Sequence, residues 1–513
     1  MSIGVLVIST LLLELAVLRR LRFDWVVVAI VLTGTLLDLH YLTYTSVDQR
    51  NYDGPSQLEY IQSIASTWRP PEVFSCVACG HPPLYYVLGA LWTKTVLLGG
   101  WLPLELGLQW LSLLLFFAFV VFALLLVRRG TTRLATLWLS AALVVFWPSS
   151  IINSVRVHND ALASPLMLAA IYFIAEWDRD GRAEDFRAAL GVCTLALLTK
   201  ASGYAVASAL LLVIALRFRA TGVRKSLAQF AVSVLVFGTS ELLVTALRVS
   251  RMARTPCQLI LGSACNGRYR PPIPDSPSRF LAFHVHDFVG RLATVPEDPF
   301  LNRFAKSSLF GVQPLGDPFT DAGHELLGRL LSVGLLLMVG VCLFALPRLG
   351  RTGLHRYRAY LASVALMLLS LLAFRLRAPN EFHEDFRHIF AALVPFCFAY
   401  AAIVTPVGGR PKWWHGAGLA LALLMIAGSV LFFARVPRPA PKSGLRSPTP
   451  TSTASTRSYS WAPSTRRPAP KAAEFPVARP TPNRTRSIRR PRRTRALRPF
   501  ERQTRQAWAA CWG

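Results

Sequence analysis

Long apolar runs recur along almost the whole of this 513-residue chain, and they restrict its fold more than any other feature. A helix that crosses a bilayer needs about 20 predominantly apolar residues, and runs of comparable length follow one another up to residue 434. Only 16% of the residues are charged, whereas soluble domains are about one quarter charged. The sequence therefore predicts an all-α polytopic membrane protein with about 11–13 transmembrane helices, half-helices included.

The formal net charge of +29 is unevenly distributed and does not indicate nucleic-acid binding. Residues 436–513 hold 18 of the 56 Lys and Arg residues but only two Glu. Many of the other basic residues lie in short segments between apolar runs, where they report membrane topology. The tail is rich in Pro, Arg, Ser and Thr without apolar periodicity, so it cannot bury a core. We therefore predict a transmembrane domain over residues 1–435 and a disordered tail over 436–513.

Basic residues orient the first two apolar runs. Arg19, Arg20 and Arg22 follow the first run, and such residues favour the cytoplasmic side of a membrane. The next run, 25–42, then leads to the outer side.

The apolar segment 83–99 is predicted not to cross the membrane. If it crossed, the run 107–127 would carry Arg128 and Arg129 to the outer side, against the preference of basic loops for the cytoplasm. We therefore expect 83–99 to lie on the outer leaflet as an interfacial helix, within a first outward loop over residues 43–106.

Three further segments complete the topology. The run 134–150 is expected to exit as one helix, and residues 248–325 are expected to form a second, long outward loop. Residues 187–216 carry Lys200 near their centre and basic segments on both sides. This pattern predicts two half-helices that meet at Lys200 on the outer side, and broken helices in membranes are tolerated chiefly where they line a cavity.

Polar candidates for a functional site gather on the outward side of this topology. They are Asp48, Asp53, His81 and Tyr85 in the first outward loop, Arg156, Asn159 and Asp160 at the outward turn where the run 159–176 begins, Lys200 at the helix break, and Arg387 and His388 in the segment NEFHEDFRH. Asn153, His158 and Asp385 lie in the same segments. Ionisable groups at membrane depth are costly and are functional candidates by default.

Simpler structural roles also fit several of these residues. Asp53 precedes Gly54-Pro55, a turn signature, and an aspartate there commonly caps the turn. Arg156 and Asp160 are four residues apart, which suits an ion pair on one helix face. Lys200 has a long side chain that can snorkel to the membrane surface.

The cysteines predict local disulfides rather than a metal site. Cys76 and Cys79 share one polar loop, and Cys257 and Cys265 share another, so two local disulfides are expected if both loops face an oxidising compartment. A single CxxC does not supply the four ligands of a zinc site. Cys193, Cys342 and Cys397 lie in apolar runs and are expected to be packed thiols. We predict no cofactor. A divalent metal bound at the segment NEFHEDFRH is the alternative, but this segment alone does not support it.

Five segments in order resemble one family of membrane enzymes. They are YDGPSQLEYIQSI, HPPLYYVLGALW, NSVRVHNDALASPLMLAAIYF, LALLTKASGY and DFRHIFAALVPFCFAYA. The order is similar to that of GT-C type glycosyltransferases, in particular the protein mannosyltransferase and lipid A aminoarabinose transferase-like group, over about residues 25–405. The resemblance implies transfer of a sugar from a polyprenyl-phosphate carrier to a lipid, glycan or protein acceptor. It also implies a multi-pass protein of the bacterial inner membrane with an outward-facing site.

The resemblance implies roles for the candidates as well. Asp53 matches the acidic residue that begins the family's first outward loop, whereas Gly54 and Gln57 stand where the family often has Glu and His. Asp53, or alternatively Asp48, is then expected to act as the base for an acceptor hydroxyl in a single inverting displacement.

Cations are expected to hold the donor phosphate in this reading, with Arg156, Lys200 and Arg387 as the main candidates and His81 nearby. The alternative is a non-catalytic lipid-glycan transporter or an accessory membrane subunit. A transporter commonly shows internal repeats, which the sequence lacks.

Overall fold

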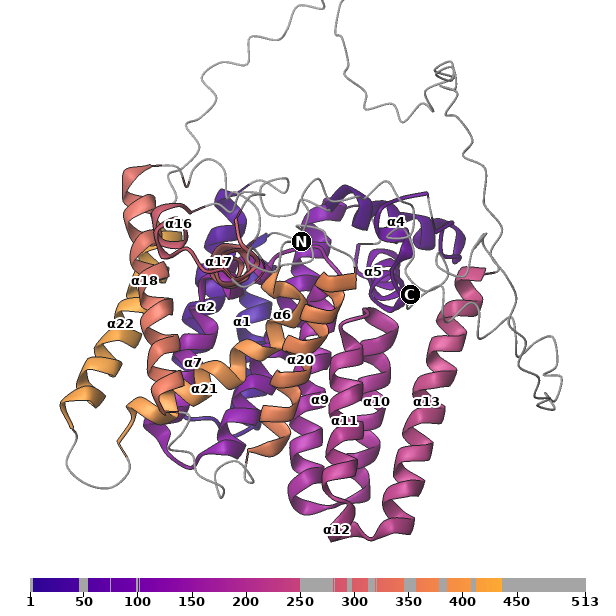
Figure 1. Ribbon diagram of the computed structural model, residues 1–513. Coiled ribbons are helices and arrows are strands. Elements are labelled where there is room, and N and C mark those ends of the chain that lie inside the picture. The colour runs from indigo at the N-terminus through magenta and orange to yellow at the C-terminus, as the bar shows by residue number, and fades with distance from the viewer. Residues whose placement is uncertain are drawn as a thin grey trace, which may run out of the picture. The chain divides into compact units, whose positions relative to one another are not determined.

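Helices make up the regular structure of this protein in a computed structural model, as the sequence predicts (Figure 1). The structure describes residues 3–45, 54–73, 75–97, 100, 102–249, 280, 282–292, 298–311, 319, 321–345, 357–377, 385–406 and 412–435. The predicted tail over 436–513 and the cysteines at 257 and 265 lie outside these residues.

Eight of the described helices are long and apolar enough to cross a membrane. They are α2 (Trp25–Tyr44), α6 (Leu104–Gly130), α9 (Asp160–Asp180), α13 (Val223–Val249), α18 (Ala322–Ala345), α20 (Arg358–Arg377), the continuous pair η5 (Phe386–Ala392) and α21 (Leu393–Val404), and α22 (Trp413–Ala434). A ninth span arises if the bent pair α7 (Leu134–Val145) and α8 (Pro148–Ser154) is counted as one. The class of polytopic all-α membrane protein is thereby confirmed.

Three further helices account for the larger number expected from the sequence. They are α1 (Ile3–Arg20), α10 (Ala183–Thr199) and α11 (Gly203–Leu216). Glu14, Arg19 and Arg20 make α1 more charged than a typical span, and α10 and α11 are shorter than one. The short helix α12 (Phe218–Thr221) connects α11 to α13.

Many large apolar side chains point away from the protein on the outer helices. Leu235 and Leu242 of α13 are 66% and 69% exposed, and Leu424 of α22 is 69% exposed. A surface this apolar is unfavourable in water but suits contact with lipid. The helix lengths and this surface together describe an integral multi-pass membrane protein.

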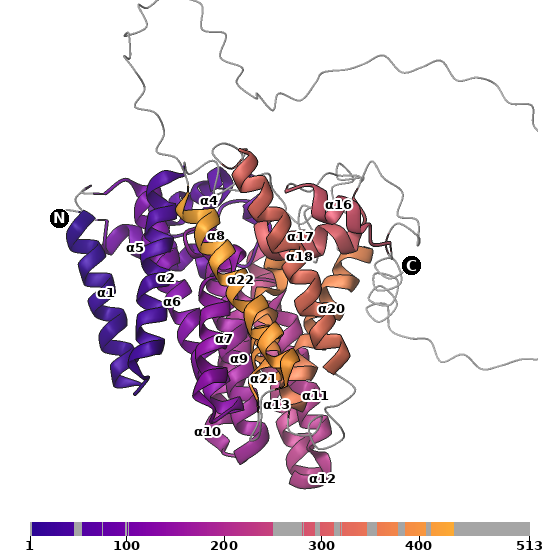
Figure 2. The same ribbon diagram turned by 90° about the vertical axis from the view of Figure 1, so that its left-hand side faces the viewer.

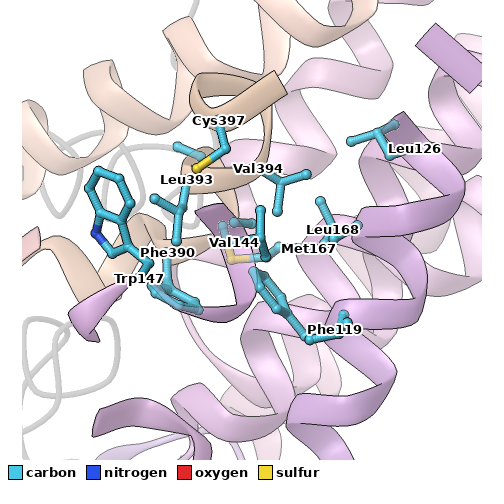
Figure 3. Packing of buried hydrophobic residues seen from close by; sticks show 14 of the residues in the cluster. Phe119, Leu126, Val144, Trp147, Met167, Leu168, Phe390, Leu393, Val394 and Cys397 are labelled. Carbon is cyan, nitrogen blue, oxygen red and sulfur yellow. The ribbon is translucent and has the colours of Figure 1, made fainter. Parts of the chain in front are cut away.

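The apolar core joins helices that are distant in sequence (Figure 3). Phe119 of α6, Met167 of α9 and Phe390 of η5 lie in one buried cluster with Val394 and Cys397 of α21. The same cluster includes Val144 and Trp147. Cys193 is buried as well and Cys342 half-buried, which confirms the expectation of packed thiols.

The segment 134–150 is not one helix, in contrast to the expectation from the sequence. α7 ends at Val145, and α8 begins at Pro148 with a bend of 58° between them. Proline lacks a backbone N–H and is favoured at the first position of a helix, so it begins a new helix here. Trp147 Nε1 and Ser149 Oγ both donate to the carbonyl of Ser308, at 2.6 and 2.7 Å, and bind the bend to α17 (Phe300–Phe310).

Short helices lie at one end of the bundle rather than across it (Figures 1 and 2). They are α4 (Gly54–Thr67), α5 (Leu84–Thr95), α16 (Val285–Gly290) and α17. With 12 residues, α5 is about 18 Å long at about 1.5 Å per residue, too short for the ~30 Å apolar core of a bilayer. This agrees with the prediction that 83–99 does not cross.

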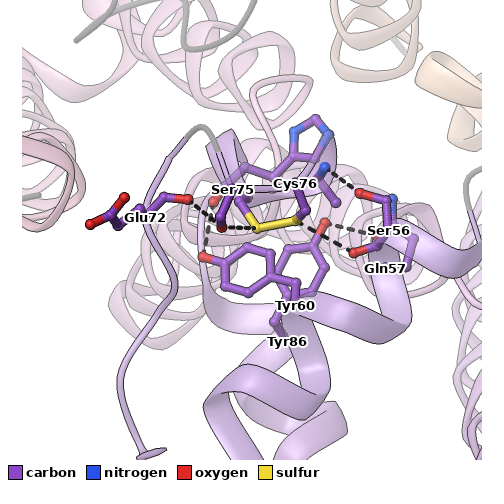
Figure 4. Close-up of a disulfide and its surroundings, with 10 residues drawn as sticks. Ser56, Gln57, Tyr60, Glu72, Ser75, Cys76 and Tyr86 are labelled. Atoms are coloured by element: carbon purple, nitrogen blue, oxygen red, sulfur yellow. Dashed lines mark hydrogen bonds between the residues drawn. A yellow bond between two sulfur atoms is a disulfide. The ribbon is translucent and has the colours of Figure 1, made fainter. Parts of the chain in front are cut away.

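A disulfide joins Cys76 and Cys79 beside α4, as predicted (Figure 4). The hydroxyl of Ser56 accepts the N–H of Ala78 at 2.7 Å in the short 3₁₀ turn Ala78–Gly80. The hydroxyl of Tyr86 donates to Gln57 Oε1 at 2.8 Å. These bonds attach the disulfide loop to α4 and α4 to α5.

The opposite end of the bundle carries interhelical ion pairs. Arg129 of α6 pairs with Glu176 and, at 2.9 Å, with Asp180, both on α9. Arg358 Nε of α20 donates to Asp178 Oδ2 at 2.8 Å. Charged side chains therefore fix the ends of α6, α9 and α20 to one another, away from α4 and α5.

Candidate functional site

The break between α10 and α11 places Lys200 against the start of α9. α10 ends at Thr199, and Lys200 adopts an extended backbone conformation before α11 begins at Gly203. Its ammonium group is buried and donates to Asp160 Oδ1, at the first residue of α9. The two half-helices predicted from the sequence do meet at Lys200, although α10 begins at Ala183 rather than at 187, because its polar first turn is helical too.

Two further side chains surround the Asp160 carboxylate. His158 Nδ1 lies 2.8 Å from Asp160 Oδ2, and Arg387 Nε lies 3.8 Å from the same oxygen. Arg387 Nε also lies 3.1 Å from Asp385 Oδ2, and its backbone N–H donates to Asp385 Oδ1 at 3.0 Å. The aspartate that begins η5 thus orients the arginine toward Asp160.

A pocket opens beside these groups. Its lining consists of Phe116, Phe119, Asn153, Arg156, His158, Asp160, Ala161, Ser164, Pro165, Arg387 and Phe390. The polar lining comes mainly from the α8–α9 turn and from η5, and the phenylalanines come from α6 and η5. The pocket therefore joins a charged side to an aromatic side.

Arg156 provides a cation directly in this pocket. It lies in the turn before α9 rather than on the helix, so the i,i+4 pairing with Asp160 considered from the sequence does not apply. Its Nη1 lies 3.5 Å from Asn153 Oδ1. Among the described residues of this cluster, three cations (Arg156, Lys200 and Arg387) face two carboxylates (Asp160 and Asp385). The cluster therefore brings cationic side chains to the wall of the pocket.

The aromatic side of the pocket is a continuous wall of three rings. The rings of Phe116 and Phe119 are stacked with centroids 5.8 Å apart. The rings of Phe119 and Phe390 are stacked at 5.0 Å. This wall continues into the apolar core of the bundle, so an apolar ligand segment is suited to it.

Tyr85 and Asn159 are buried near the cluster without lining the pocket. Tyr85 of α5 packs edge-on against Tyr86 at 5.4 Å, and burial raises the pKa of its hydroxyl, which therefore stays protonated at neutral pH. Asn159 is 0% exposed, and neither atom of its amide has a hydrogen-bond partner among the described residues. A buried amide without partners is uncommon, which makes Asn159 a candidate for contact with a ligand.

Other candidates from the sequence lie elsewhere. His81 lines a separate pocket of about 300 Å³ with Tyr60, Pro70 and Val244. The ring of His388 packs edge-on against Phe374 at 6.1 Å. Asp48 and Asp53 lie outside the described residues, so their predicted catalytic role stays a prediction.

Some residues of the site were not selected from the sequence. Three of them, His158, Asn153 and Asp385, lie in the candidate segments. Their position in the sequence close to Arg156, Asp160 and Arg387 is the signal that indicates them. The sequence did not indicate the phenylalanine wall, because aromatic residues are frequent in apolar runs. Within the described ranges, no three His, Cys, Asp or Glu side chains come together as metal ligands.

No family model and no curated protein matches this sequence. Several solved structures match this chain, and two of them are described here. One is the archaeal oligosaccharyltransferase AglB from Archaeoglobus fulgidus in complex with an inhibitory peptide and a dolichol-phosphate, with a TM-score of 0.44 and 13% identity over 80% of this chain and 55% of AglB. The other is ArnT from Cupriavidus metallidurans bound to undecaprenyl phosphate, with a TM-score of 0.37 and 16% identity over 79% of this chain and 75% of ArnT. The chain thus spans about half the length of AglB, and similarity at this level establishes neither family nor activity.

Proposed function

We propose that this chain is a membrane glycosyltransferase that moves a sugar from a polyprenyl-phosphate carrier to an acceptor on the non-cytoplasmic face. The pocket that joins the cationic cluster to the phenylalanine wall carries the proposal. A polyprenyl phosphate has the complementary chemistry, an anionic phosphate attached to an apolar isoprenoid chain. Ligand pockets typically combine such an apolar lining with a few placed polar groups.

The cations would act on the leaving group. Arg156 and Arg387 are suited to charge-assisted hydrogen bonds with the donor phosphate, and Lys200 adds positive charge behind them. When the bond between the anomeric carbon and the phosphate oxygen breaks, negative charge grows on that oxygen. Cations that are already fixed in place stabilise this charge without rearrangement.

Asp160 is assigned a positioning role rather than that of the base. Its carboxylate contacts Lys200, His158 and Arg387, so a proton transferred to it would weaken all of these ion pairs. It therefore orients the cations.

The base is proposed to be Asp53, with Asp48 as the alternative. In the sequence Asp53 directly precedes α4, which lies at the same end of the bundle as α8 (Figure 2), and α8 contributes Asn153 to the pocket. The acceptor oxygen attacks the anomeric carbon, its proton passes to the carboxylate, and the carrier leaves as polyprenyl phosphate. One displacement of this kind inverts the anomeric carbon.

The distribution of basic residues supports an outward-facing pocket. Arg19, Arg20, Arg128 and Arg129 lie at the ends of α1 and α6 that are remote from α4 and α5. Because basic segments favour the cytoplasm, this distribution supports a pocket on the non-cytoplasmic side. The sequence resemblance suggests the bacterial inner membrane.

Sugar transfer by purified protein tests the proposal. Proteoliposomes with wild type, Asp53→Asn or Glu184→Gln receive a panel of radiolabelled polyprenyl-phosphate sugars and acceptor extract. Glu184 is the matched control, because its side chain is 67% exposed at the far end of the bundle. We expect transfer by wild type and Glu184→Gln, and a loss of about 10²–10⁴-fold in Asp53→Asn, the usual contribution of a general base.

Other outcomes have defined meanings. Equal transfer by wild type and Asp53→Asn would move the base to Asp48. Failure of wild type to transfer any sugar, with donor and acceptor present, would contradict the enzyme assignment. The second candidate function would then be a lipid-glycan transporter. Two buried carboxylates inside the bundle, Glu14 and Asp38, favour it, because membrane-embedded acids often serve ion-coupled transport.

A further inference from the structure

A second pocket lies inside the bundle and contains two acidic side chains. Glu14 of α1 and Asp38 of α2 line this pocket, and they are 0% and 2% exposed. The two helices lie side by side and α6 runs next to them (Figure 2). Both carboxyl groups are therefore far from bulk water.

The Glu14 carboxyl group has one hydroxyl partner. The Oγ1 of Thr35 lies 3.0 Å from Glu14 Oε1 and 2.9 Å from Glu14 Oε2. A hydroxyl has a single hydrogen to donate, so one carboxyl oxygen of Glu14 receives it and the other does not.

Asp38 is even less satisfied as an anion. Its Oδ1 is buried without a hydrogen-bond partner among the described residues. The hydroxyl of Ser154 lies next to Asp38 and 2.8 Å from the carbonyl of Ile151. Its single hydrogen serves one of these two acceptors at a time, so Ser154 satisfies at most one oxygen of an ionised Asp38, whereas a protonated Asp38 can donate to Ser154.

Within the part of the chain that the structure describes, no cation lines this pocket. The remaining lining residues are Val31, Thr35, Leu113, Phe116, Phe117, Val120 and Val145. Glu14 and Asp38 are thus the titratable groups among the lining residues, and the residues contributed by α6 and α7 are not titratable. Two ionised carboxylates in an apolar space without a counter-ion are strongly unfavourable.

We propose that Glu14 and Asp38 form a membrane-embedded proton-binding site that holds at least one proton at neutral pH. Its ligand is a proton, bound on a carboxyl oxygen and satisfied by Thr35 and Ser154. Phe116 lines this pocket and the cationic pocket alike, so the bound proton lies one side chain away from the proposed donor site. Acidic groups in this position commonly take part in proton transfer.

Infrared spectroscopy of the full chain in proteoliposomes tests this site directly. A protonated carboxyl group has a C=O stretch that is separate from that of a carboxylate and shifts in D₂O. Spectra are compared at neutral pH for wild type, Asp38→Asn, Glu14→Gln and the double variant with both substitutions, each with and without Na⁺. Both substitutions are near-isosteric, and Glu105→Gln, an exposed acid on α6, serves as the control.

We expect a protonated-carboxyl band in wild type and in Glu105→Gln, with or without Na⁺. At least one of the two single variants should lose this band, and the double variant should lack it. The proposal would be overturned if wild type and the double variant did not differ in this band. A band that appears only after removal of Na⁺ would also overturn it, since it would identify Na⁺ as the occupant. Should a variant fail to fold, the wild-type spectrum still decides, because absence of any protonated-carboxyl band at neutral pH overturns the proposal.

Discussion

At the scale of single residues, the pair of Lys200 and Asp160 is the most demanding interaction in the site. Both side chains are buried, and each is the main opposite charge for the other. Such a pair is weak as a source of net stability, but loss of one member leaves an uncompensated buried charge. Its two members are therefore expected to be strongly coupled.

We predict that Lys200→Met lowers the free energy of unfolding by about 3–5 kcal/mol, the range for a broken buried pair. Addition of Asp160→Asn removes the uncompensated carboxylate, so the double variant should be more stable than the sum of the single effects indicates. Unfolding in detergent micelles measures all three. The exposed Lys94 of α5 provides the control, and Lys94→Met should change stability by no more than about 0.5 kcal/mol. Simple additivity would show that the two groups do not interact.

The sequence indicated these residues but not their partners. Asp160, Lys200 and Arg387 stood out because charged residues are rare beside apolar runs. Their convergence depends on helix packing that periodicity does not encode. Glu14 and Asp38 were missed, although a single acid inside an apolar run carries the same signal.

At the scale of elements, the α10–α11 hairpin sets the position of Lys200. Gly203, the first residue of α11, lies so close to α10 that a Cβ would come within 2.6 Å of the backbone of Ala196 and Leu197. Only glycine allows this approach without a shift of one helix. The hairpin geometry therefore depends on Gly203.

We predict that Gly203→Ala separates α10 from α11, lowers the unfolding temperature and reduces sugar transfer. The control is Gly191→Ala in α10, where a Cβ meets no atom within 4 Å. That substitution should raise stability by about 0.5–1 kcal/mol, because alanine is the better helix former. Thermal unfolding of both variants in one detergent compares them. Equal stability of both variants would show that the close contact is dispensable.

Helix breaks differed in how well the sequence revealed them. Basic segments on both sides of 187–216 revealed the break at Lys200. Trp147-Pro148 lies inside a continuous apolar run, so 134–150 resembled one helix. A proline fits the first turn of a helix as well as a kink, and hydrophobicity alone does not distinguish the two.

At the scale of the whole molecule, the two ends of the helix bundle differ in their basic residues. This difference predicts which end faces the cytoplasm. His286 of α16, with a side chain 99% exposed, lies at the pocket end. Glu184, 67% exposed, lies at the opposite end. Positive-inside orientation places the first outside and the second in the cytoplasm.

Labelling of introduced cysteines tests this topology. His286→Cys and Glu184→Cys are made in a background with serine at positions 257, 265 and 511. We predict that a membrane-impermeant maleimide labels His286→Cys in intact cells and labels Glu184→Cys only after permeabilisation. The reverse pattern would place the pocket on the cytoplasmic side.

The sequence was sufficient for the class of the molecule and for its non-crossing segment 83–99. The length of the apolar runs determines the first, and the basic residues Arg128 and Arg129 determine the second. The pocket was not predictable, because Phe116 and Phe119 of α6 meet Arg387 only after the helices pack. The sequence thus indicated several of the charged residues of the site, but only the packed helices show which of them lie together.

Binding of polyprenyl phosphate is the most direct test of the central claim that the pocket holds a lipid phosphate. Radiolabelled polyprenyl phosphate is titrated against wild type, Arg156→Gln and Arg187→Gln in nanodiscs, where Arg187 is an exposed arginine near the opposite end of the bundle. We predict saturable binding that Arg156→Gln weakens about tenfold or more, since a hydrogen bond to a charged group is worth about 1.5–3 kcal/mol, and that Arg187→Gln leaves unchanged. Equal affinity of all three proteins, or no saturable binding by wild type, would contradict the claim.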